Sequence, residues 1–181
     1  MNAPETIQQL VDTEAIRRLA LLYARGVDRQ DAGLLRSLYT DDAVDNHGTI
    51  YQGSAAGYVD FLESTFPLIT IGCHYICNHL IELLGPDSAE GEVYALGYHI
   101  IPTADGGHTE SFVGVRYLDK YRREADRWRF HQRDVVFDLE SSRPVAHGGG
   151  SPSEATRDDS YSALSGLVFR RSGHDENRPD H

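Results

Sequence analysis

The sequence predicts an α+β fold in which three N-terminal helices pack on one face of a curved antiparallel or mixed sheet. The first third of the chain has apolar residues at every third or fourth position, the spacing of amphipathic helices. After Pro67 follow four long segments rich in Ile, Val, Tyr and Phe, separated by short turns. Helices that precede such a meander must cover one face of its sheet, and the curvature leaves a pocket between the layers.

The first helix is predicted from Ile7 to about Val27, because the apolar residues of this segment form a single stripe. Asp12 and Thr13 are candidate caps for its main part, since short polar side chains accept hydrogen bonds from the first free backbone N–H groups. Gly26, near the end of the stripe, favours termination there.

The next segment is predicted to contain two shorter helices with an arm between them. Asp31 is a candidate cap for a second helix, Ala32 to Tyr39. The acidic pair Asp41–Asp42 predicts a turn, after which Ala43 to Tyr51 is predicted to be a strand or strand-like arm. Ser54 is a candidate cap for a third helix that ends near Phe66.

Four long strands are predicted for the second half of the chain. They span Thr70–Leu84, Glu90–Pro102, Thr109–Arg123 and Arg127–Leu139. Each is rich in β-branched and aromatic residues, and Gly, Pro or Asp residues stand in the connections. Tight turns between consecutive strands imply an antiparallel meander.

The C-terminal part departs from this pattern, so residues 1–140 are predicted to be one domain and residues 141–181 a loop and tail. Ser141–Asp159 contains a run of three glycines and is expected to be a loop. Ser160–Arg170 is expected to form a short helix or strand that docks on the rest of the chain or at an oligomer interface. The polar segment Ser172–His181 is expected to be disordered.

Composition excludes several classes of partner. With 181 residues, 40% of them hydrophobic, the chain can bury a single core without a disulfide or metal. Its formal net charge of −11 repels phosphate backbones, so nucleic acid is not an expected partner. No apolar run approaches the ~20 residues of a membrane helix, and the N-terminus lacks the pattern of a signal peptide. We therefore expect a cytoplasmic protein that does not bind membranes.

The segment from Cys73 to His79 resembles a metal-binding sequence only at first sight. On a strand, Cys73 and Cys77 would lie about 13 Å apart, whereas zinc–sulfur bonds are about 2.3 Å long. Two cysteines also make no disulfide framework. The sequence therefore predicts no metal site.

The alternation of side chains along a strand sorts residues by sheet face. His74 is expected to share its face with Ile76, Asn78 and Leu80, and the opposite face is expected to hold Cys73, Tyr75, Cys77, His79 and Ile81. Arg133 is expected to share its face with His131, Val135 and Phe137. Both faces carry apolar residues, which predicts a homo-oligomer, a dimer or trimer, that uses the outer face.

Three short motifs in fixed order resemble the N-terminal signature of SnoaL-like domains in the NTF2-like superfamily. They are Tyr23-Ala-Arg-Gly-Val-Asp28, then Asp31, then Leu38-Tyr-Thr-Asp-Asp-Ala43. The chain is similar within that superfamily to scytalone dehydratase, the lindane dehydrochlorinase and the bile-acid dehydratase, from about Ile7 to Phe137. The resemblance implies a cone-shaped NTF2-like fold and suggests a trimer.

The resemblance also implies catalytic residues. Those enzymes have an Asp after the first helix and a His on the first long strand, which correspond here to Asp28 and His74. The dehydrochlorinase and the bile-acid dehydratase have an Arg five residues after a Trp, which corresponds to Arg133. The bile-acid enzyme has a Tyr that matches Tyr23, and scytalone dehydratase a second His that matches His99.

Substrate-binding residues are expected on the arm and the last strand. His47 lies near the position where scytalone dehydratase has a substrate-binding Tyr, so this chain differs from that enzyme there. Tyr51, Phe137 and His131 complete the set of expected binding residues.

These residue types fit acid–base chemistry. His is the commonest base for removing a proton next to a carbonyl group, and an Asp on its other ring nitrogen fixes the tautomer. Arg133 can neutralise a developing oxyanion, while Tyr23 or His99 can donate a proton to the leaving group. The chemistry requires no metal, flavin or nucleotide, so no cofactor is expected.

Structural roles remain open for each of these residues. Asp28 could cap the following helix, and His74 could be a hydrogen-bonded core histidine. Arg133 could be an ion-pair partner of Asp134 or Asp138, and Tyr23 could belong to the core.

Three functions remain open on this evidence. The first is a cofactor-independent lyase, a dehydratase of a small hydrophobic hydroxylated cyclic ketone, steroid or polyketide-like substrate. The second is a double-bond isomerase or epoxide hydrolase at the same site, and the third is a non-catalytic ligand-binding domain. The fold alone does not choose among them.

Overall fold

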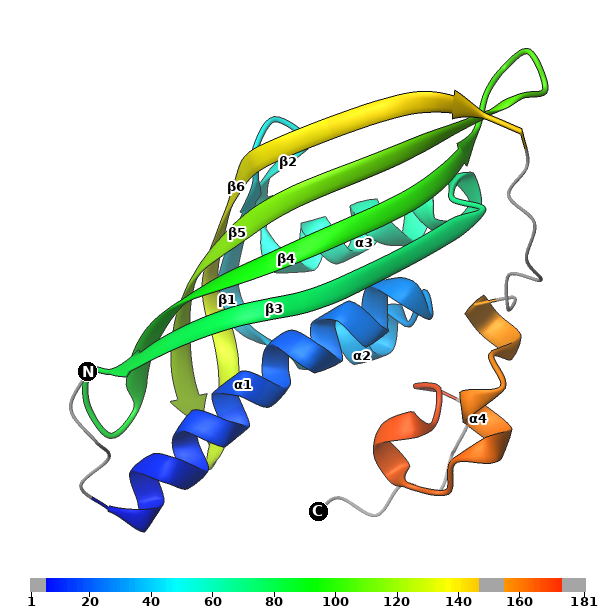
Figure 1. Ribbon diagram of the computed structural model, residues 1–181. Coiled ribbons are helices and arrows are strands. Elements are labelled where there is room, and N and C mark those ends of the chain that lie inside the picture. The colour runs from blue at the N-terminus through cyan, green and yellow to red at the C-terminus, as the bar shows by residue number, and fades with distance from the viewer. Residues whose placement is uncertain (1–5, 147–154, 174–181) are drawn as a thin grey trace.

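The computed structural model describes residues 6–146 and 155–173. Three helices lie along one face of a strongly bent six-stranded sheet, so the molecule is an α+β cone with an open, mixed sheet (Figure 1). This is the fold class that the sequence predicts. None of the described helices is long and apolar enough to span a membrane.

Helix α1 spans Ile7–Asp28, close to the predicted range. Its cap is Thr6, whose side chain accepts a hydrogen bond from the backbone N–H of Gln9 and whose own backbone N–H donates to the Gln9 side chain, which makes a capping box. The prediction that Asp12 and Thr13 cap the helix is wrong. Asp12 lies inside the helix and is buried, and it accepts hydrogen bonds from Trp128 and Arg123 of the sheet.

Helices α2, Ala32–Ser37, and α3, Ala55–Thr65, begin at the predicted caps. Asp31 accepts a hydrogen bond from the backbone N–H of Leu34, and Ser54 accepts one from that of Gly57. Each cap satisfies a donor that the first turn of a helix leaves free. A short 3₁₀ turn, Phe66–Leu68, then leads into the sheet.

The arm between α2 and α3 is two strands, whereas one was predicted. Strand β1, Tyr39–His47, and strand β2, Tyr51–Ser54, pair antiparallel, with His47 opposite Tyr51. The chain reverses at Gly48, whose φ of +58° is a conformation that glycine adopts without strain. The predicted turn at 41–42 is absent, because β1 begins at Tyr39 and runs through it.

Four long strands form the meander: β3 Ile71–Leu83, β4 Ser88–Pro102, β5 His108–Glu124 and β6 Arg127–Val145. The sheet order is β2-β1-β6-β5-β4-β3, and only β1 and β6 are parallel. Strand β6 continues past Leu139, so the predicted loop from Ser141 begins too early. The reason is that β5 is long enough to pair with it, with Ser111 opposite Ser142.

Two irregularities in the strands overturn the predicted faces. A register shift between Ile76 and His79 on β3 turns His79 to the face of His74, in place of Asn78 and Leu80. His79 then hydrogen-bonds to the Tyr121 hydroxyl in the interior, at 3.1 Å. A bulge inserts an extra residue into one strand and switches the alternation beyond it, which a strict period of two cannot anticipate.

The second irregularity lies on β6, where both Phe130 and Arg133 are fully buried. His131, between them, is half-buried and hydrogen-bonds to Thr40, so it does not share the face of Arg133 as predicted.

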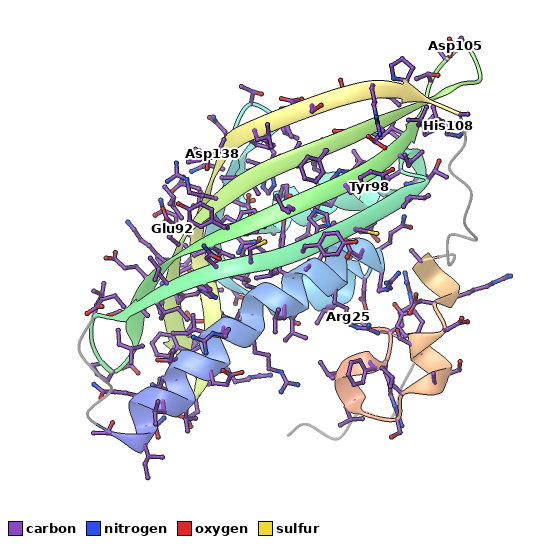
Figure 2. The ribbon with its side chains drawn as sticks, viewed as in Figure 1. Arg25, Glu92, Tyr98, Asp105, His108 and Asp138 are labelled. Carbon is purple, nitrogen blue, oxygen red and sulfur yellow. The ribbon has the colours of Figure 1, made fainter. Side chains whose placement is uncertain are left out.

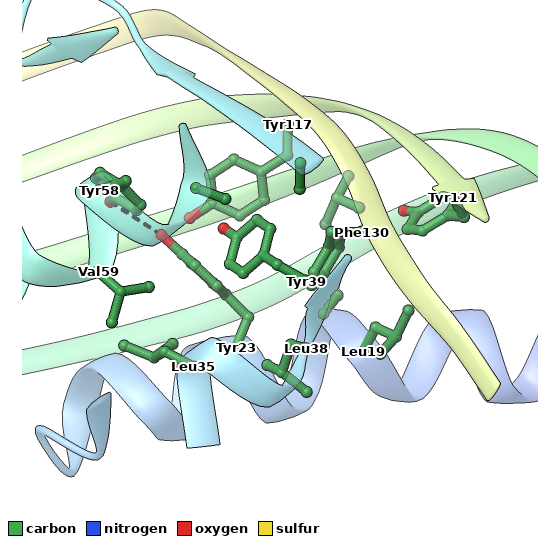
Figure 3. Close-up of a cluster of buried hydrophobic side chains, with 14 of the residues drawn as sticks. Leu19, Tyr23, Leu35, Leu38, Tyr39, Tyr58, Val59, Tyr117, Tyr121 and Phe130 are labelled. Carbon is green, nitrogen blue, oxygen red and sulfur yellow. Dashed lines mark hydrogen bonds between the residues drawn. The ribbon is translucent and has the colours of Figure 1, made fainter. Parts of the chain in front are cut away.

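The core fills the space between the helices and the bent sheet, and aromatic rings dominate its centre (Figure 3). Tyr23 of α1 packs edge-on against Tyr117 and Phe130, with ring centroids 5.8 and 6.2 Å away. Burial of each large apolar side chain contributes about 1.5–3 kcal/mol. The same rings surround the polar groups of the site.

The C-terminal residues that the structure describes are 155–173, which include the segment Ser160–Arg170 that was predicted to dock. This segment contains a short helix, α4, Ser160–Ala163, and 3₁₀ turns at Ala155–Arg157 and Leu167–Phe169. It lies against the end of α1, where the Arg25 guanidinium donates to the Phe169 carbonyl (Figure 1). The predicted disorder of Ser172–His181 falls almost wholly outside the described residues.

Candidate functional site

Asp28 and His74 meet where the last turn of α1 crosses β3. Oδ1 of Asp28 lies 2.6 Å from Nδ1 of His74, and Oδ2 accepts a hydrogen bond from the His74 backbone N–H at 3.0 Å. Their side chains are 15% and 13% exposed, so both are in contact with solvent. Because one carboxylate holds both the ring and the backbone of His74, the imidazole has a fixed orientation.

The carboxylate also selects the tautomer of His74. An ionised carboxylate only accepts hydrogen bonds, so Nδ1 carries the proton that Asp28 receives, and Nε2 of the neutral ring is left as an acceptor. No described residue hydrogen-bonds to this Nε2. A methyl group added at Gly97 would lie 3.6 Å from Nε2, so glycine keeps the space beside it open.

His99 is the neighbour of His74 on β4. The two rings meet edge to face, with centroids 5.2 Å apart. Burial lowers the pKa of His99 to about 4, and the nearby His74 contributes to the shift. His99 is therefore neutral near pH 7.

Tyr23 lies deeper, in the aromatic core. It is 2% exposed, and its hydroxyl lies 3.1 Å from the Tyr58 hydroxyl (Figure 3). Burial raises the pKa of the Tyr23 hydroxyl far above its usual value. The phenol therefore stays protonated and can serve as a hydrogen-bond donor.

Arg133 is fully buried beside Tyr23, and its ion-pair partner is Asp119 on β5. Nε and one terminal nitrogen donate to the two Asp119 oxygens at 2.7 and 2.8 Å. Burial alone would lower the pKa of Arg133, but Asp119 outweighs it and holds that pKa well above its usual value. The alternative partners considered from the sequence, Asp134 and Asp138, are engaged elsewhere.

The second terminal nitrogen of Arg133 has no hydrogen-bond partner among the described residues. Instead the guanidinium carbon lies 4.2, 4.1 and 4.2 Å from the ring centroids of Tyr23, Tyr117 and Phe130. Contacts of a cation with aromatic faces compensate part of the lost hydration.

Three of the four expected binding residues form one cluster. His47 stacks on Tyr58 with centroids 4.6 Å apart and meets Phe137 edge-on at 6.3 Å. Tyr51 packs against Tyr58 at 5.5 Å. His131 does not belong to the cluster, because it is half-buried beside Thr40 on the other face of the strand.

Sequence reasoning missed Asp45, the partner of His47. Its carboxylate is fully buried, accepts from the Tyr39 hydroxyl at 2.7 Å, and lies 3.0 Å from Nδ1 of His47. The signal was present, since residues two apart on a strand lie on the same face. Tyr58 and Asp119 were also missed, because only the register and helix packing bring them to the site.

The opposite face of the sheet holds a groove of about 590 Å³ that contains none of the predicted site residues. It is lined by Leu80, Glu82, Glu92, Leu118 and their neighbours. Glu92 and Asp138 lie on this outer side, whereas Arg25 points to the C-terminal segment (Figure 2). No group of three or more His, Cys, Asp or Glu side chains within residues 6–146 and 155–173 is arranged to hold a metal.

Comparison with known proteins identifies relatives of the fold. A family model described as a SnoaL-like domain matches residues 8–134. A hexachlorocyclohexane dehydrochlorinase, LinA type 2, superposes with a TM-score of 0.68 at 22% identity, over 81% of this chain and 97% of that chain. A comparison with curated proteins finds no match.

Two further structures illustrate the range of proteins with this fold. A proposed scytalone dehydratase from Novosphingobium aromaticivorans gives a TM-score of 0.68 at 18% identity, over 80% of this chain and 97% of that chain. The β subunit of a proposed aromatic-ring-hydroxylating dioxygenase from that species gives 0.59 at 15%, over 72% and 92%. At these identities the likeness concerns the fold.

Proposed function

The chain belongs to the SnoaL-like domain family and has the NTF2-like fold, and from this premise we propose that it is a cofactor-independent lyase. The reaction is the dehydration of a small hydrophobic hydroxylated cyclic ketone, which includes steroid and polyketide-like skeletons. The names of the dehydrochlorinase and of the proposed dehydratase support an elimination reaction.

One observation carries the proposal: His74 is held by Asp28 at 2.6 Å and keeps Nε2 without a partner among the described residues. A general base needs a free lone pair, a fixed orientation and access to its substrate. The two hydrogen bonds from Asp28 give the orientation, and the 13% exposure of the His74 side chain gives the access.

In the proposed reaction, Nε2 of His74 removes the proton from the carbon next to the carbonyl group. The C–H electrons form an enolate, and Asp28 stabilises the imidazolium that results. Return of the enolate electrons forms the C=C bond and breaks the C–O bond to the β-hydroxyl group. The leaving hydroxide takes a proton from Tyr23 and departs as water.

Arg133 has an electrostatic role in this proposal. Its charge is buried and held by Asp119, and one of its terminal nitrogens has no hydrogen-bond partner among the described residues. A preorganised charge in a water-poor interior stabilises a developing anion more strongly than the same charge in water. His99, neutral near pH 7, packs against the base and does not compete with it for a proton.

A homo-oligomer is part of the proposal. Tyr75, Leu80 and Leu118 are 60, 51 and 37% exposed on the outer face of the sheet, where a second copy would cover them. Light scattering on the purified chain would give a dimer or trimer mass, and a monomer mass at micromolar concentration would contradict this part.

The test is turnover of a panel of β-hydroxy cyclic ketones, from β-hydroxycyclohexanone to hydroxylated decalones, followed by mass spectrometry. We expect a product lighter by one water, and we expect His74→Ala to lower the rate by about 10²–10⁴, the usual contribution of general acid–base catalysis. A product of unchanged mass would identify an isomerase. Binding without turnover, or full activity in His74→Ala, would refute the lyase.

A further inference from the structure

The chain contains a second Asp–His pair, on strand β1 and away from the proposed base. Asp45 and His47 lie two residues apart, so their side chains point to the same face of the strand and meet at 3.0 Å. Asp45 is fully buried, whereas the His47 side chain is 14% exposed. His47 is thus the member of the pair that can exchange protons with water.

A continuous chain of hydrogen bonds runs from this pair to the core. Nε2 of His47 lies 3.2 Å from the Tyr58 hydroxyl, and that hydroxyl lies 3.1 Å from the hydroxyl of Tyr23 (Figure 3). The His47 ring also stacks on the Tyr58 ring, with centroids 4.6 Å apart and planes 17° apart. The stacking fixes the relative position of donor and acceptor.

The protonation state of His47 determines which atom donates in each of these hydrogen bonds. Asp45 can only accept, so Nδ1 of His47 keeps its proton, and Nε2 of the neutral ring must accept from Tyr58. Tyr58 then accepts from Tyr23. When His47 is protonated at both nitrogens, each bond reverses, and the Tyr23 proton is free to be donated elsewhere.

We propose that Asp45, His47 and Tyr58 form a proton relay that ends at the Tyr23 hydroxyl and supplies the proton for the leaving group. The inference rests on the proposed function, because it gives Tyr23 its source of protons. Tyr23 donates its proton to the leaving hydroxide and receives one from Tyr58. Tyr58 receives one from Nε2 of His47, and His47 recovers one from solvent. The His74 imidazolium releases the proton taken from the substrate to solvent, so the cycle consumes no net proton.

The relay removes an obstacle that burial creates. Burial raises the pKa values of Tyr23 and Tyr58 well above the usual range, so a phenolate at either position is costly. If each proton is replaced as it leaves, neither residue becomes a phenolate. The proton that enters the relay starts on His47, which lies 3.0 Å from the Asp45 carboxylate.

Tyr117 is the buried ring beside the Tyr23 end of the relay. It packs edge-on against Tyr23 at 5.8 Å, and both the Asp28 and Asp45 carboxylates lie within electrostatic reach of it. Burial raises the pKa of Tyr117 to about 12, and these carboxylates add to the shift.

The first test needs no substrate. Tyrosines labelled with ¹³C at Cζ are followed by NMR while His47 is titrated. The groups packed against His47 are Asp45 on β1, Tyr58 on α3 and Phe137 on β6, and of these Asp45 carries the charge. We expect the Tyr23 signal to follow His47 in the wild type and not in Tyr58→Phe. A Tyr23 signal that ignores His47, or follows it equally in Tyr58→Phe, overturns the relay.

The second test uses β-hydroxycyclohexanone deuterated next to the carbonyl group. We expect Tyr58→Phe and Tyr23→Phe each to slow loss of water on the order of 10², with no further loss in the double variant, because both break one relay. Exchange of the deuterium should persist, since it depends on His74. Effects that multiply, or unchanged dehydration in Tyr58→Phe, overturn the relay.

Failure of the relay and failure of the proposed function give different results. A wild type that neither exchanges the deuterium nor releases water refutes the proposed function, while the NMR titration still decides whether the relay exists. Tyr94→Phe is the matched control, because Tyr94 is 42% exposed on the outer face of the sheet.

Discussion

The two Asp–His pairs of this chain have the same chemical groups but are assembled in different ways. Asp28 and His74 are 46 residues apart and meet only because α1 packs on β3, whereas Asp45 and His47 are neighbours on one strand. In the first pair, no described residue bonds Nε2, and both residues are reachable from solvent. In the second, Nε2 is bonded to Tyr58, and the carboxylate is enclosed.

This difference suits the Asp28–His74 pair to the role of a base and the Asp45–His47 pair to the role of a proton relay. A histidine with a free Nε2 can take a proton directly from a substrate, while a histidine whose Nε2 is bonded to a tyrosine passes its proton to that tyrosine. We also expect the buried Asp45 carboxylate to contribute more to stability than Asp28, because its removal as an acceptor leaves buried donors unpaired. Changes in the first pair should therefore affect the rate, and changes in the second should affect stability more.

The largest expected effect is that of Asp28→Asn on the rate. The amide cannot accept from both Nδ1 and the backbone N–H of His74, so the ring loses its tautomer and orientation. We expect kcat to fall by about 10²–10⁴ with little change in melting temperature. The measurement is dehydration of the best ketone of the panel together with a thermal melt. If Asp28→Asn lowered the melting temperature as much as Asp45→Asn does, the two pairs would not differ in their contribution to stability.

Asp45→Asn should show the opposite balance. The Tyr39 hydroxyl and His47 both donate to this enclosed carboxylate, and an amide can accept from only one of them. We expect the free energy of unfolding to fall by about 1–3 kcal/mol, the cost of an unpaired buried group. Urea unfolding followed by tryptophan fluorescence measures it. An unchanged midpoint would mean that Asp45 has no greater structural role than Asp28.

Gly97→Ala tests whether the space beside His74 can accept an added methyl group. The added Cβ would lie 3.0 Å from Val113 Cγ2 and 3.2 Å from His99 Cε1, so these two side chains must shift beside His74. We expect kcat to fall on the order of tenfold, since misplacing a reacting group by about 1 Å can cost up to 10². Gly85→Ala is the control, because its nearest contact is 3.5 Å from Ser88 Oγ. Equal kcat values for Gly97→Ala and Gly85→Ala would show that the space beside His74 tolerates the added methyl group.

The pH dependence of stability should reflect His99 and His79. Burial lowers both pKa values to about 4, from 6.5, so the folded state keeps these rings neutral while the unfolded chain protonates them. Below pH 6.5 the unfolded state binds more protons, so the free energy of unfolding falls as pH drops toward 4. Urea midpoints from pH 7 to pH 4 measure this slope, which His99→Gln should reduce. The same slope in that variant would contradict the assignment.

The smallest expected effect is that of Arg171→Gln in the C-terminal segment. The Arg171 guanidinium donates to the carbonyl oxygens of Arg29 and Gln30, which follow Asp28 directly. Losing these bonds should loosen the turn after Asp28 and lower kcat by less than tenfold, while amide exchange at residues 28–30 becomes faster. Arg17→Gln, which loses only an exposed pair with Glu14, is the control. If amide exchange at residues 28–30 were as slow in Arg171→Gln as in Arg17→Gln, Arg171 would not stabilise this turn.

The sequence predicts the helices and strands well, because Asp31 and Ser54 are strong local caps and the apolar periods are regular. It does not predict the bulges at 76–79 and 130–133, since a bulge depends on the partner strand. Pairing of Arg133 with Asp119 likewise requires the register of β5 and β6. The position of Asp28 beside His74 follows from a family resemblance and not from periodicity, and their catalytic role stays a prediction.

The parallel pairing of β1 with β6 has a consequence for biosynthesis. Asn46 bonds to Asp134, 88 residues later, so the arm that holds Asp45 and His47 cannot complete its ladder until the last long strand has left the ribosome. Until then the apolar faces of the three helices lack the sheet against which they pack in the folded protein. Contacts between distant segments form late, and until they form the exposed apolar surface can associate with other chains. Slower translation after the codons of α3 should therefore increase the dependence of the yield on chaperones.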